Sequence, residues 1–334
     1  MSIQKVYYFK KDLRNVTEYY YGIILKGLNM ASIKTVEIDN FSRKKSPCIP
    51  KEDYLLVTEL VDFFVLYLRG YRHFIYWFQG ITPEEHFLNK HSRWKYLLYS
   101  YMEKLALKKI EYRIGVSKYL FEHYNRKYHL NIPLSKVFIM PCYNSELQKD
   151  SFFTVNKYEE NVFCYAGGVQ KWQGFEDILE IYNRIEEKND NVLLKVFSKD
   201  LDYAKKLLHE RGIKNYQVEC LPQSEVDEAL SKCKFGFIIR EDDVINNVAT
   251  PTKLATYIGN GVIPIITKTI FSFRDLSNKY KYICCLRDKN DIDPIVKLLE
   301  AKYDADAVYG EFSKVFEDYY NTEKYTNMLS KYFS

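Results

Sequence analysis

The sequence predicts an α/β protein with two Rossmann-like, doubly wound domains, and three observations lead to this class. The chain has 334 residues, which is more than one hydrophobic core usually serves. Strand-like and helix-like segments alternate along most of it, as in parallel sheets that carry helices on both faces. A polar stretch at 143–160 interrupts the alternation once, and this indicates a boundary between two domains.

The first half opens with the strand-like run KVYYFK at 5–10 and then repeats a rhythm of helix and strand. The further strands are expected at 33–39, 72–78, 112–117 and 136–141. The helices are expected at 16–29, 53–70, 92–109 and 118–128.

The rhythm restarts after the polar stretch with the strand NVFCYAGG at 161–168. Further strands are expected at 192–198, 216–222, 235–240 and 262–267, and helices at 175–187, 202–211 and 224–232. A ten-residue polar loop, EDDVINNVAT, follows the strand that ends at Arg240. The final segment, 306–334, has the pattern of two helices without an intervening strand.

Charge is distributed unevenly and limits the classes of partner. Residues 1–150 carry 24 basic and 15 acidic side chains, a net of +9, while the remainder carries 25 and 29, a net of −4, which together give the chain's +5. A basic half suits an anionic membrane, a phosphate-bearing acceptor or nucleic acid, or it is simply a solvated surface. No recognisable reader motif organises the basic residues, so nucleic acid is the least favoured partner.

The remaining composition predicts a cytoplasmic protein. The seven cysteines are scattered and odd in number, which favours a reducing compartment, and no Cys/His cluster has metal-ligand spacing. The apolar region at 54–78 contains four charged residues, so it does not suit a membrane span. The N-terminus lacks the pattern of a signal peptide.

The stretch ATPTKLATYIGNGVIPII at 249–266 predicts a helix that starts at the functional edge of a sheet. Thr250 is expected to cap this helix, with proline as its first residue. Free N–H groups at the helix start, together with Lys253 and Arg240, favour a phosphate or diphosphate. The alternative is that both cations are solvated or paired with the acidic residues at 241–243.

A second strand, turn and helix is expected in YAGGVQKWQGFED at 165–177. Gly167 and Gly168 permit a close approach of the backbone to a ligand. Lys171 is suited to a phosphate, and Trp172 to stacking on a ring. A surface lysine and a packed tryptophan are the alternatives, and packing is the more common role of tryptophan.

In order, these segments resemble glycosyltransferases of the GT-B fold, in particular family 4 and its relatives in bacterial capsule, exopolysaccharide and O-antigen synthesis. The matching C-terminal motifs are YAGGVQKWQG, LPQSEVDEALSKCKFGFIIREDD and PTKLATYIGNGVIPII. The N-terminal ones are WFQGITPEE, EKLALKKIEYRIGVSKYLFEHY and VFIMPCYNSE. The resemblance covers nearly the whole chain, and the order of the motifs is more specific than any one of them.

The resemblance implies two domains that face a cleft. An acceptor-side domain at 1–145 would bind a glycan, by family precedent a lipid-linked one, and a domain at 160–305 would bind a nucleotide-sugar. The helices at 306–334 would cross back to the first domain. The implied activity is hexosyl transfer with retention, at the inner face of the cell membrane, without a cofactor.

On this reading, Arg240 and Lys253, together with the amides of Thr252 and Lys253, hold the donor diphosphate and stabilise it as the leaving group. The protein would then supply the positive charge, and no metal would be required. The other donor-side residues that the resemblance implies are Gly167, Gly168, Lys171 and Thr256.

The loop after the strand at 72–78 would face the acceptor. There the resemblance places Gln79, Glu84 and Glu85, and a carboxylate at this position orients or deprotonates a hydroxyl. For one of the two glutamates, the alternative is a first-turn acid that complements a helix dipole. His86 and His91 are expected to be surface histidines.

The chain departs from the family at its paired glutamates, which are replaced by Val248 and Thr256. The acidic residues at 241–243 lie nearby, and Asp242 is the candidate to substitute in catalysis. The family's lysine before the next glycine is Gln173 here.

Two alternatives to an active transferase follow from these departures. One is a non-catalytic glycosyltransferase-like subunit that binds a partner enzyme, and the other is a nucleotide-sugar epimerase of the same fold. A transferase that acts on a lipid-linked glycan would make peripheral contact with an anionic membrane. The apolar stripe Trp94, Leu97, Leu98, Tyr101 and Leu105 on the helix at 92–109 suits such contact, although core packing is the commoner explanation of a stripe.

Overall fold

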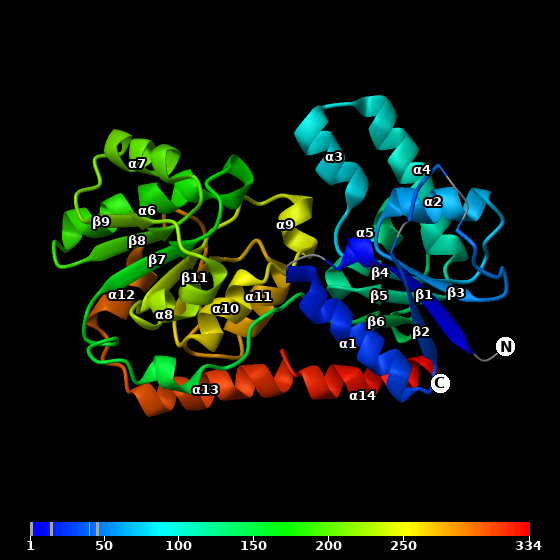
Figure 1. Ribbon diagram of the computed structural model, residues 1–334. Coiled ribbons are helices and arrows are strands. Elements are labelled where there is room, and N and C mark those ends of the chain that lie inside the picture. Colours follow the sequence, from blue (N-terminus) through cyan, green and yellow to red (C-terminus); the bar gives the residue numbers. More distant parts are fainter. Residues whose placement is uncertain (1–2, 14–15, 40, 45–46) are drawn as a thin grey trace. The chain divides into compact units, whose positions relative to one another are not determined.

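The chain forms two compact units, each built on one parallel sheet (Figure 1). The computed structural model describes residues 3–13, 16–39, 41–44 and 47–334, the side chains of Val16 and Lys171 excepted. The first unit comprises Met1–Asn144, Val248–Thr250 and Asn321–Ser334, and the second comprises Ser145–Asn247 and Pro251–Tyr320. The prediction of two doubly wound α/β domains is confirmed.

The sheet of the first unit has the order β2-β1-β3-β4-β5-β6, and its neighbouring strands are parallel. The strands are β1 (Lys5–Phe9), β2 (Lys34–Ile38), β3 (Tyr54–Val57), β4 (Phe74–Phe78), β5 (Tyr112–Gly115) and β6 (Val137–Ile139). The central strands β3 and β4 are buried throughout, as expected of a parallel sheet. The winding of the sheet reverses between β1 and β3, which is where ligands bind in such sheets.

Helices and short 3-10 turns connect these strands. They are η1 (Lys10–Asp12), α1 (Val16–Met30), α2 (Leu60–Leu68), α3 (Thr82–Lys90), α4 (Arg93–Lys109), α5 (Lys118–Tyr128) and η2 (Leu134–Lys136). The helix at 118–128 has the predicted bounds, because the Ser117 hydroxyl caps it by accepting from Leu120 N–H. The single helix predicted at 53–70 is wrong: an apolar run without clear periodicity forms strand β3 before helix α2 begins.

The second sheet has the order β12-β11-β10-β7-β8-β9, again with parallel neighbours. Its strands are β7 (Val162–Ala166), β8 (Leu193–Phe197), β9 (Tyr216–Glu219), β10 (Phe235–Ile238), β11 (Ile263–Thr267) and β12 (Cys284–Leu286). The first strand of this unit, β7, lies between β8 and β10. The winding therefore reverses between β7 and β10, and the loops after these two strands occupy the usual ligand position.

The second unit also contains 3-10 turns and helices. They are η3 (Lys149–Phe152), η4 (Lys171–Gln173), α6 (Phe175–Lys188), α7 (Leu201–Glu210), η5 (Gln223–Glu225), α8 (Val226–Ser231), α9 (Val244–Val248), α10 (Lys253–Gly259), α11 (Phe271–Ser277), α12 (Asp293–Glu300) and α13 (Ala305–Asp318). The polar loop predicted after Arg240 contains α9, because Asp243 accepts from Asn246 N–H and caps it. Thr250 does not cap α10, which begins at Lys253. Its hydroxyl instead accepts from Cys142 N–H, and the threonine is buried.

The chain ends in the two predicted helices, α13 and α14 (Thr322–Phe333). Asp304 caps the first and Asn321 the second. Helix α14 belongs to the first unit, where it packs against α1. Gly27 makes this contact close, since a Cβ there would lie 2.5 Å from the Cβ of Leu329.

Helix α4 buries the opposite face from the one that the apolar stripe suggests. Met102, Ala106 and Leu107 are buried, whereas Trp94 is 64% and Leu97 67% exposed. The expectation that the stripe packs in the core is therefore wrong. No helix within the described ranges has the length and apolar character needed to cross a membrane.

Candidate functional site

The glycine turn after β7 is shaped around a lysine of α10. Gly167 has φ +152°, a conformation that favours glycine. A Cβ at this position would lie 2.4 Å from Lys253 Nζ. Only a residue without a side chain therefore lets the ammonium lie against the turn.

Arg240 follows β10, the strand next to β7, and its guanidinium points to the same edge of the sheet. It is 8% exposed. Its Nη1 donates to the carbonyl oxygen of Trp172 at 2.7 Å, and its Nη2 donates to Gln173 Oε1 at 2.7 Å. Its backbone N–H donates to the hydroxyl of Thr267 on β11, which fixes the position of the arginine relative to the sheet.

Lys253 shares a hydrogen-bond acceptor with Arg240. Its Nζ donates to Gln173 Oε1 at 2.9 Å and to the hydroxyl of Tyr165 at 3.1 Å. Burial, and then the charge of Arg240, hold the pKa of Lys253 well below its usual range. Two cations thus converge on one neutral amide oxygen.

The Arg240–Lys253 pair has no directly bonded counterion among the described residues. In the part of the chain that the structure describes, neither cation forms an ion pair with a carboxylate. A buried charge without a partner is unfavourable, and buried ionised groups are normally paired. The site is therefore electrostatically suited to an anion with several oxygens, such as a diphosphate.

In the described part of the chain, three other residues predicted for this site, Thr252, Thr256 and Asp242, form no hydrogen bond with Arg240 or Lys253. Thr252 precedes α10 without a side-chain cap, and the hydroxyl of Thr256 lies 3.0 Å from that of Ser145. The carboxylate of Asp242 is exposed and accepts from Asn247, and none of the hydrogen bonds between described residues joins it to Arg240 or Lys253.

The turn between Gly168 and α6 carries the last two predicted residues. The side chain of Lys171 lies outside the described part of the chain. Trp172 is 51% exposed, so the expectation of a packed tryptophan is wrong. The turn that carries it is held by the Arg240 guanidinium, which leaves the indole free at the surface.

Gln173 and Tyr165 also contact the Arg240–Lys253 pair, and sequence analysis did not single them out as functional. Gln173 was noted only because it replaces a lysine of the family. Its amide oxygen now proves to be the group on which both cations converge. The available signal was the substitution itself: glutamine, a hydrogen-bond acceptor, stands at the position where the family has a lysine.

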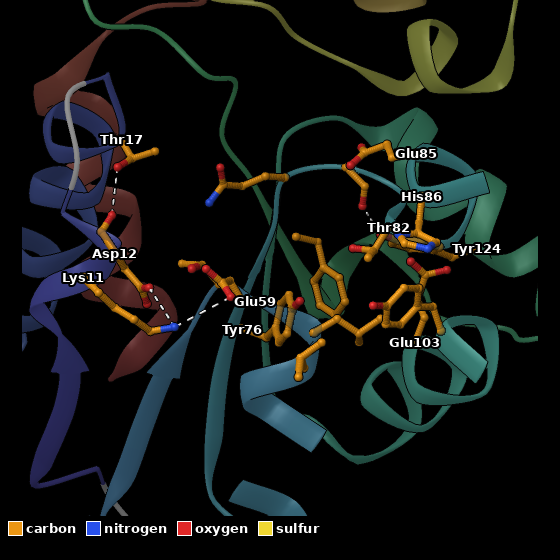
Figure 2. A pocket seen from close by; sticks show the side chains of 17 residues that line it. Lys11, Asp12, Thr17, Glu59, Tyr76, Thr82, Glu85, His86, Glu103 and Tyr124 are labelled. Atoms are coloured by element: carbon orange, nitrogen blue, oxygen red, sulfur yellow. Dashed lines mark hydrogen bonds and ion pairs between the residues drawn. The ribbon is translucent and has the colours of Figure 1, made fainter. Parts of the chain in front are cut away.

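A pocket of about 440 Å³ opens at the carboxyl edge of the first sheet (Figure 2). Its lining comes from the segments that follow β1, β3 and β4, and from α3, α4 and α5. The lining residues are Lys11, Asp12, Thr17, Thr58, Glu59, Leu60, Val61, Tyr76, Phe78, Gln79, Gly80, Thr82, Glu85, His86, Tyr99, Glu103 and Tyr124. This pocket lies at the point where the winding of the first sheet reverses, which is the expected ligand position.

Two of the three predicted acceptor-side residues line this pocket. Gln79 lies directly after β4, and Glu85 lies in the first turn of α3, where one of its oxygens accepts from Ile81 N–H. Burial raises the pKa of Glu85. Glu84 is instead engaged by Lys127, with Nζ 2.8 Å from Oε1.

The hydrogen bonds of Glu84 lower the pKa of its carboxyl group. Burial raises its pKa, but hydrogen bonds from His123 and Lys127 outweigh burial and leave it lowered. Lys127 also contacts Glu103, which lines the pocket, and burial raises the pKa of Glu103 to about 7.

Asp12 lies on the opposite side of the pocket from Glu85, as Figure 2 shows, and sequence analysis missed it. Its side chain is 3% exposed. Burial raises its pKa to about 6, with Lys11 opposing the shift. Its position directly after the first strand of a doubly wound sheet was the available signal.

Asp12, Glu59 and Asp62 form the group of carboxylates best placed to hold a cation. Their oxygens lie within 4.8 Å of one another. Lys11 already contacts all three, with Nζ 3.8 Å from Asp12 and 3.7 Å from Glu59, and Arg43 contacts Glu59 and Asp62. The protein's own cations thus supply the positive charge here.

His86 also lines the pocket, contrary to the expectation of a surface histidine. Its ring packs edge-on against Tyr99, with centroids 5.0 Å apart. Its Nε2 is buried and has no hydrogen-bond partner among the described residues.

Neither a protein-family profile nor a curated protein sequence matches the chain. Solved structures do match. Anabaena Alr3699/HepE, in complex with UDP and glucose, has a TM-score of 0.67 at 9% identity, over 98% of each chain. The Burkholderia xenovorans α,α-trehalose-phosphate synthase (UDP-forming), in complex with glucose-6-phosphate, has a TM-score of 0.59 at 9% identity, over 94% of this chain and 77% of that one.

A third match is a single-site mutant of S. aureus TarM in complex with fondaparinux, α-GlcNAc-glycerol and UDP. Its TM-score is 0.58 at 12% identity, and the match covers 85% of this chain. The chain spans only about half of TarM, with 56% of TarM covered. Together these likenesses show that the chain has the GT-B glycosyltransferase fold, as the sequence resemblance implied.

Proposed function

We propose that the protein is a glycosyltransferase that moves a sugar from a nucleotide-sugar donor to a glycan acceptor. The observation that carries this proposal is the Arg240–Lys253 pair, two buried cations without a counterion among the described residues, at the ligand-binding edge of the second sheet. UDP is the nucleotide to test first, because the HepE and TarM structures of the same fold hold it.

In this proposal the diphosphate of the donor takes the place of Gln173 Oε1 as the partner of both cations. Charge-assisted hydrogen bonds from Arg240 and Lys253 stabilise the diphosphate as it leaves with the electron pair of the glycosidic bond. Thr252 and Thr256 lie beside this position, and the exposed indole of Trp172 is available to stack on the base. Gly167 and Gly168 keep the backbone clear of the diphosphate. The transfer proceeds without a metal and with retention.

The acceptor binds in the pocket of the first unit. Gln79 and Glu85 line it and orient the hydroxyl that is glycosylated. Glu84 supports this wall through Lys127, which also contacts Glu103. Asp242 is the remaining acidic candidate near the donor site.

The donor site is tested by thermal unfolding of the purified protein with UDP and UDP-glucose. A ligand that binds only the native state must raise the midpoint. We expect both ligands to raise it for the unaltered chain and for Lys206→Ala, an exposed lysine of α7, but not for Lys253→Ala. A shift retained in Lys253→Ala would remove the donor-site assignment. Binding of UDP-glucose without transfer or hydrolysis would favour the non-catalytic subunit, and conversion without an acceptor the epimerase.

We further propose that the acceptor is lipid-linked, as in bacterial surface polysaccharide synthesis, and that α4 contacts an anionic membrane. The exposed face of α4 presents Trp94, Leu97 and Tyr101, each more than 60% exposed. The helix carries five basic residues, and its only acidic residue, Glu103, is buried on the other face. Apolar side chains flanked by lysines suit insertion at an anionic lipid surface.

Sedimentation with vesicles tests the membrane contact. We expect the protein to bind vesicles of phosphatidylglycerol and phosphatidylcholine, and to bind much less to phosphatidylcholine alone. Trp94→Glu with Leu97→Glu should abolish binding. Val155→Glu, at an 85% exposed valine of the second unit, is the matched control and should bind as the unaltered chain does. Equal binding by all three proteins would contradict the contact.

A further inference from the structure

Two buried polar atoms in the pocket of the first unit have no hydrogen-bond partner among the described residues. Asp12 Oδ2 and His86 Nε2 are both inaccessible to solvent, and neither is bonded within the described part of the chain. They belong to different segments, η1 and α3, yet both residues line the same pocket (Figure 2). Buried polar atoms are nearly always bonded in folded proteins, so these two indicate a ligand that is rich in hydrogen-bonding groups.

The charge of the described lining disfavours an anionic ligand. Of the described lining residues, four are carboxylates, namely Asp12, Glu59, Glu85 and Glu103, and one, Lys11, is a cation. Lys11 is already engaged by Asp12, Glu59 and Asp62. A phosphate in this pocket would face several carboxylates and, among the described lining residues, find no free ammonium or guanidinium group, and such juxtaposition of like charges is costly.

The rest of the lining suits a sugar ring. Tyr99 is half-buried and presents its ring, Tyr76, Phe78 and Tyr124 form the buried aromatic wall behind the pocket, and the volume of about 440 Å³ lies within the range of small-molecule sites. A pyranose offers apolar C–H faces to such rings and hydroxyl donors to carboxylates. Carboxylate oxygens are acceptors only, so hydroxyl groups match them and phosphate oxygens do not.

We propose that this pocket binds an uncharged sugar residue of the acceptor, that Asp12 accepts a hydrogen bond from one of its hydroxyls, and that sugar phosphates are rejected. The inference rests on the proposed function, since it names the class of acceptor for that reaction. An uncharged ligand in this pocket would differ from the sugar phosphate in the Burkholderia synthase of the same fold, whose crystal structure is a complex with glucose-6-phosphate.

A structural role for Asp12 makes the opposite prediction for stability. If Asp12 served the fold, its replacement would lower the melting midpoint. As a ligand-binding carboxylate held in a buried site with one oxygen unbonded among the described residues, it is unfavourable in the free protein. Asp12→Asn should therefore weaken sugar binding while the midpoint at pH 8 rises.

Saturation-transfer NMR tests the acceptor class with matched pairs of probes. Glucose and N-acetylglucosamine are compared with their 6-phosphates at equal concentration, in the presence of UDP. We expect transfer to the uncharged sugars that is about tenfold stronger than to the phosphates, and its loss in Asp12→Asn. Asp39→Asn, a surface aspartate paired with Lys10, is the matched control and should behave as the unaltered chain does.

Three results would overturn the inference: equal or stronger binding of the phosphates, unchanged binding in Asp12→Asn, or binding of none of the four sugars by a protein that binds UDP. UDP binding is measured on the same samples by thermal unfolding. Failure of the acceptor assignment with UDP binding intact leaves the donor site standing. Failure of UDP binding falls on the proposed function instead, because the sugar pocket lies in the other unit.

Discussion

The two units present sites of opposite charge on sheets of the same kind. Each sheet is parallel, and each site follows the strands between which the winding reverses. In the second unit two cations, Arg240 and Lys253, converge without a counterion among the described residues. In the first unit the pocket is lined by four carboxylates and a single cation, counted over its described residues. We therefore infer that the shared architecture determines the position of each candidate site, and that the residues after each strand determine the class of ligand it suits.

The largest effect is expected at the cation pair. Removing one partner of a close charge pair in a buried site costs at least about 2 kcal/mol, or roughly thirtyfold in affinity. Lys253→Met should therefore weaken UDP binding about thirtyfold or more, measured by calorimetric titration. In the free protein the same change should raise the melting midpoint, because the ammonium is held charged next to Arg240 only at a cost. A lower midpoint would show that Lys253 serves stability.

The next effect is the pH dependence at Asp12. Its pKa is raised from 3.8 to about 6 on folding, so its ionised form is disfavoured in the native state. The free energy of unfolding should accordingly fall as the pH rises from about 4 to 6, and the loss should persist above 6. Since one pKa unit corresponds to about 1.4 kcal/mol, the loss is about 3 kcal/mol at most.

Denaturant unfolding at pH 4 and pH 8 measures this difference. Asp12→Asn should reduce the fall in stability between the two pH values, and Asp39→Asn should leave it unchanged. Asp12 is also surrounded by Lys11, Tyr21, Arg43, Glu59 and Asp62, and both variants retain these residues. An identical pH profile in Asp12→Asn would contradict the raised pKa.

A smaller effect is expected at the glycine turn of the second unit. Gly167→Ala places a Cβ on the ammonium of Lys253 and forces a side chain into a conformation that favours glycine. We expect a loss of about 1–3 kcal/mol in stability and weaker UDP binding. Gly310→Ala in α13 of the same unit meets open space, so the melting midpoint should rise slightly. Equal behaviour of the two variants would contradict the geometry of the turn.

Five of the six strands of the second unit were predictable because their apolar runs are short and bounded by glycine, proline or polar residues, whereas the edge strand β12 was missed. The region 53–70 was not, since Tyr54–Val57 is apolar in every position and its periodicity does not distinguish strand from helix. The capping of α10 was also mispredicted: Thr250 has the right residue type for a cap, but a tertiary hydrogen bond to Cys142 N–H takes its hydroxyl.

The candidate sites were predictable to a different degree in the two units. Arg240, Lys253 and Gly167 are adjacent to recognisable strand ends, and the structure brings them together. Asp12 carries no motif, and its role depends on a raised pKa and on an oxygen that no described residue bonds. Both properties arise from packing between segments far apart in sequence, which no local pattern records.

The most direct test of the Arg240–Lys253 site is calorimetric titration of UDP in two buffers with different heats of ionisation. An anion beside Lys253 should raise its lowered pKa, so UDP binding should be coupled to proton uptake over the pH range in which Lys253 titrates. We predict measurable affinity with proton uptake for the unaltered chain, and loss of both in the Arg240→Ala, Lys253→Met double variant. Equally tight binding by the double variant would contradict the account.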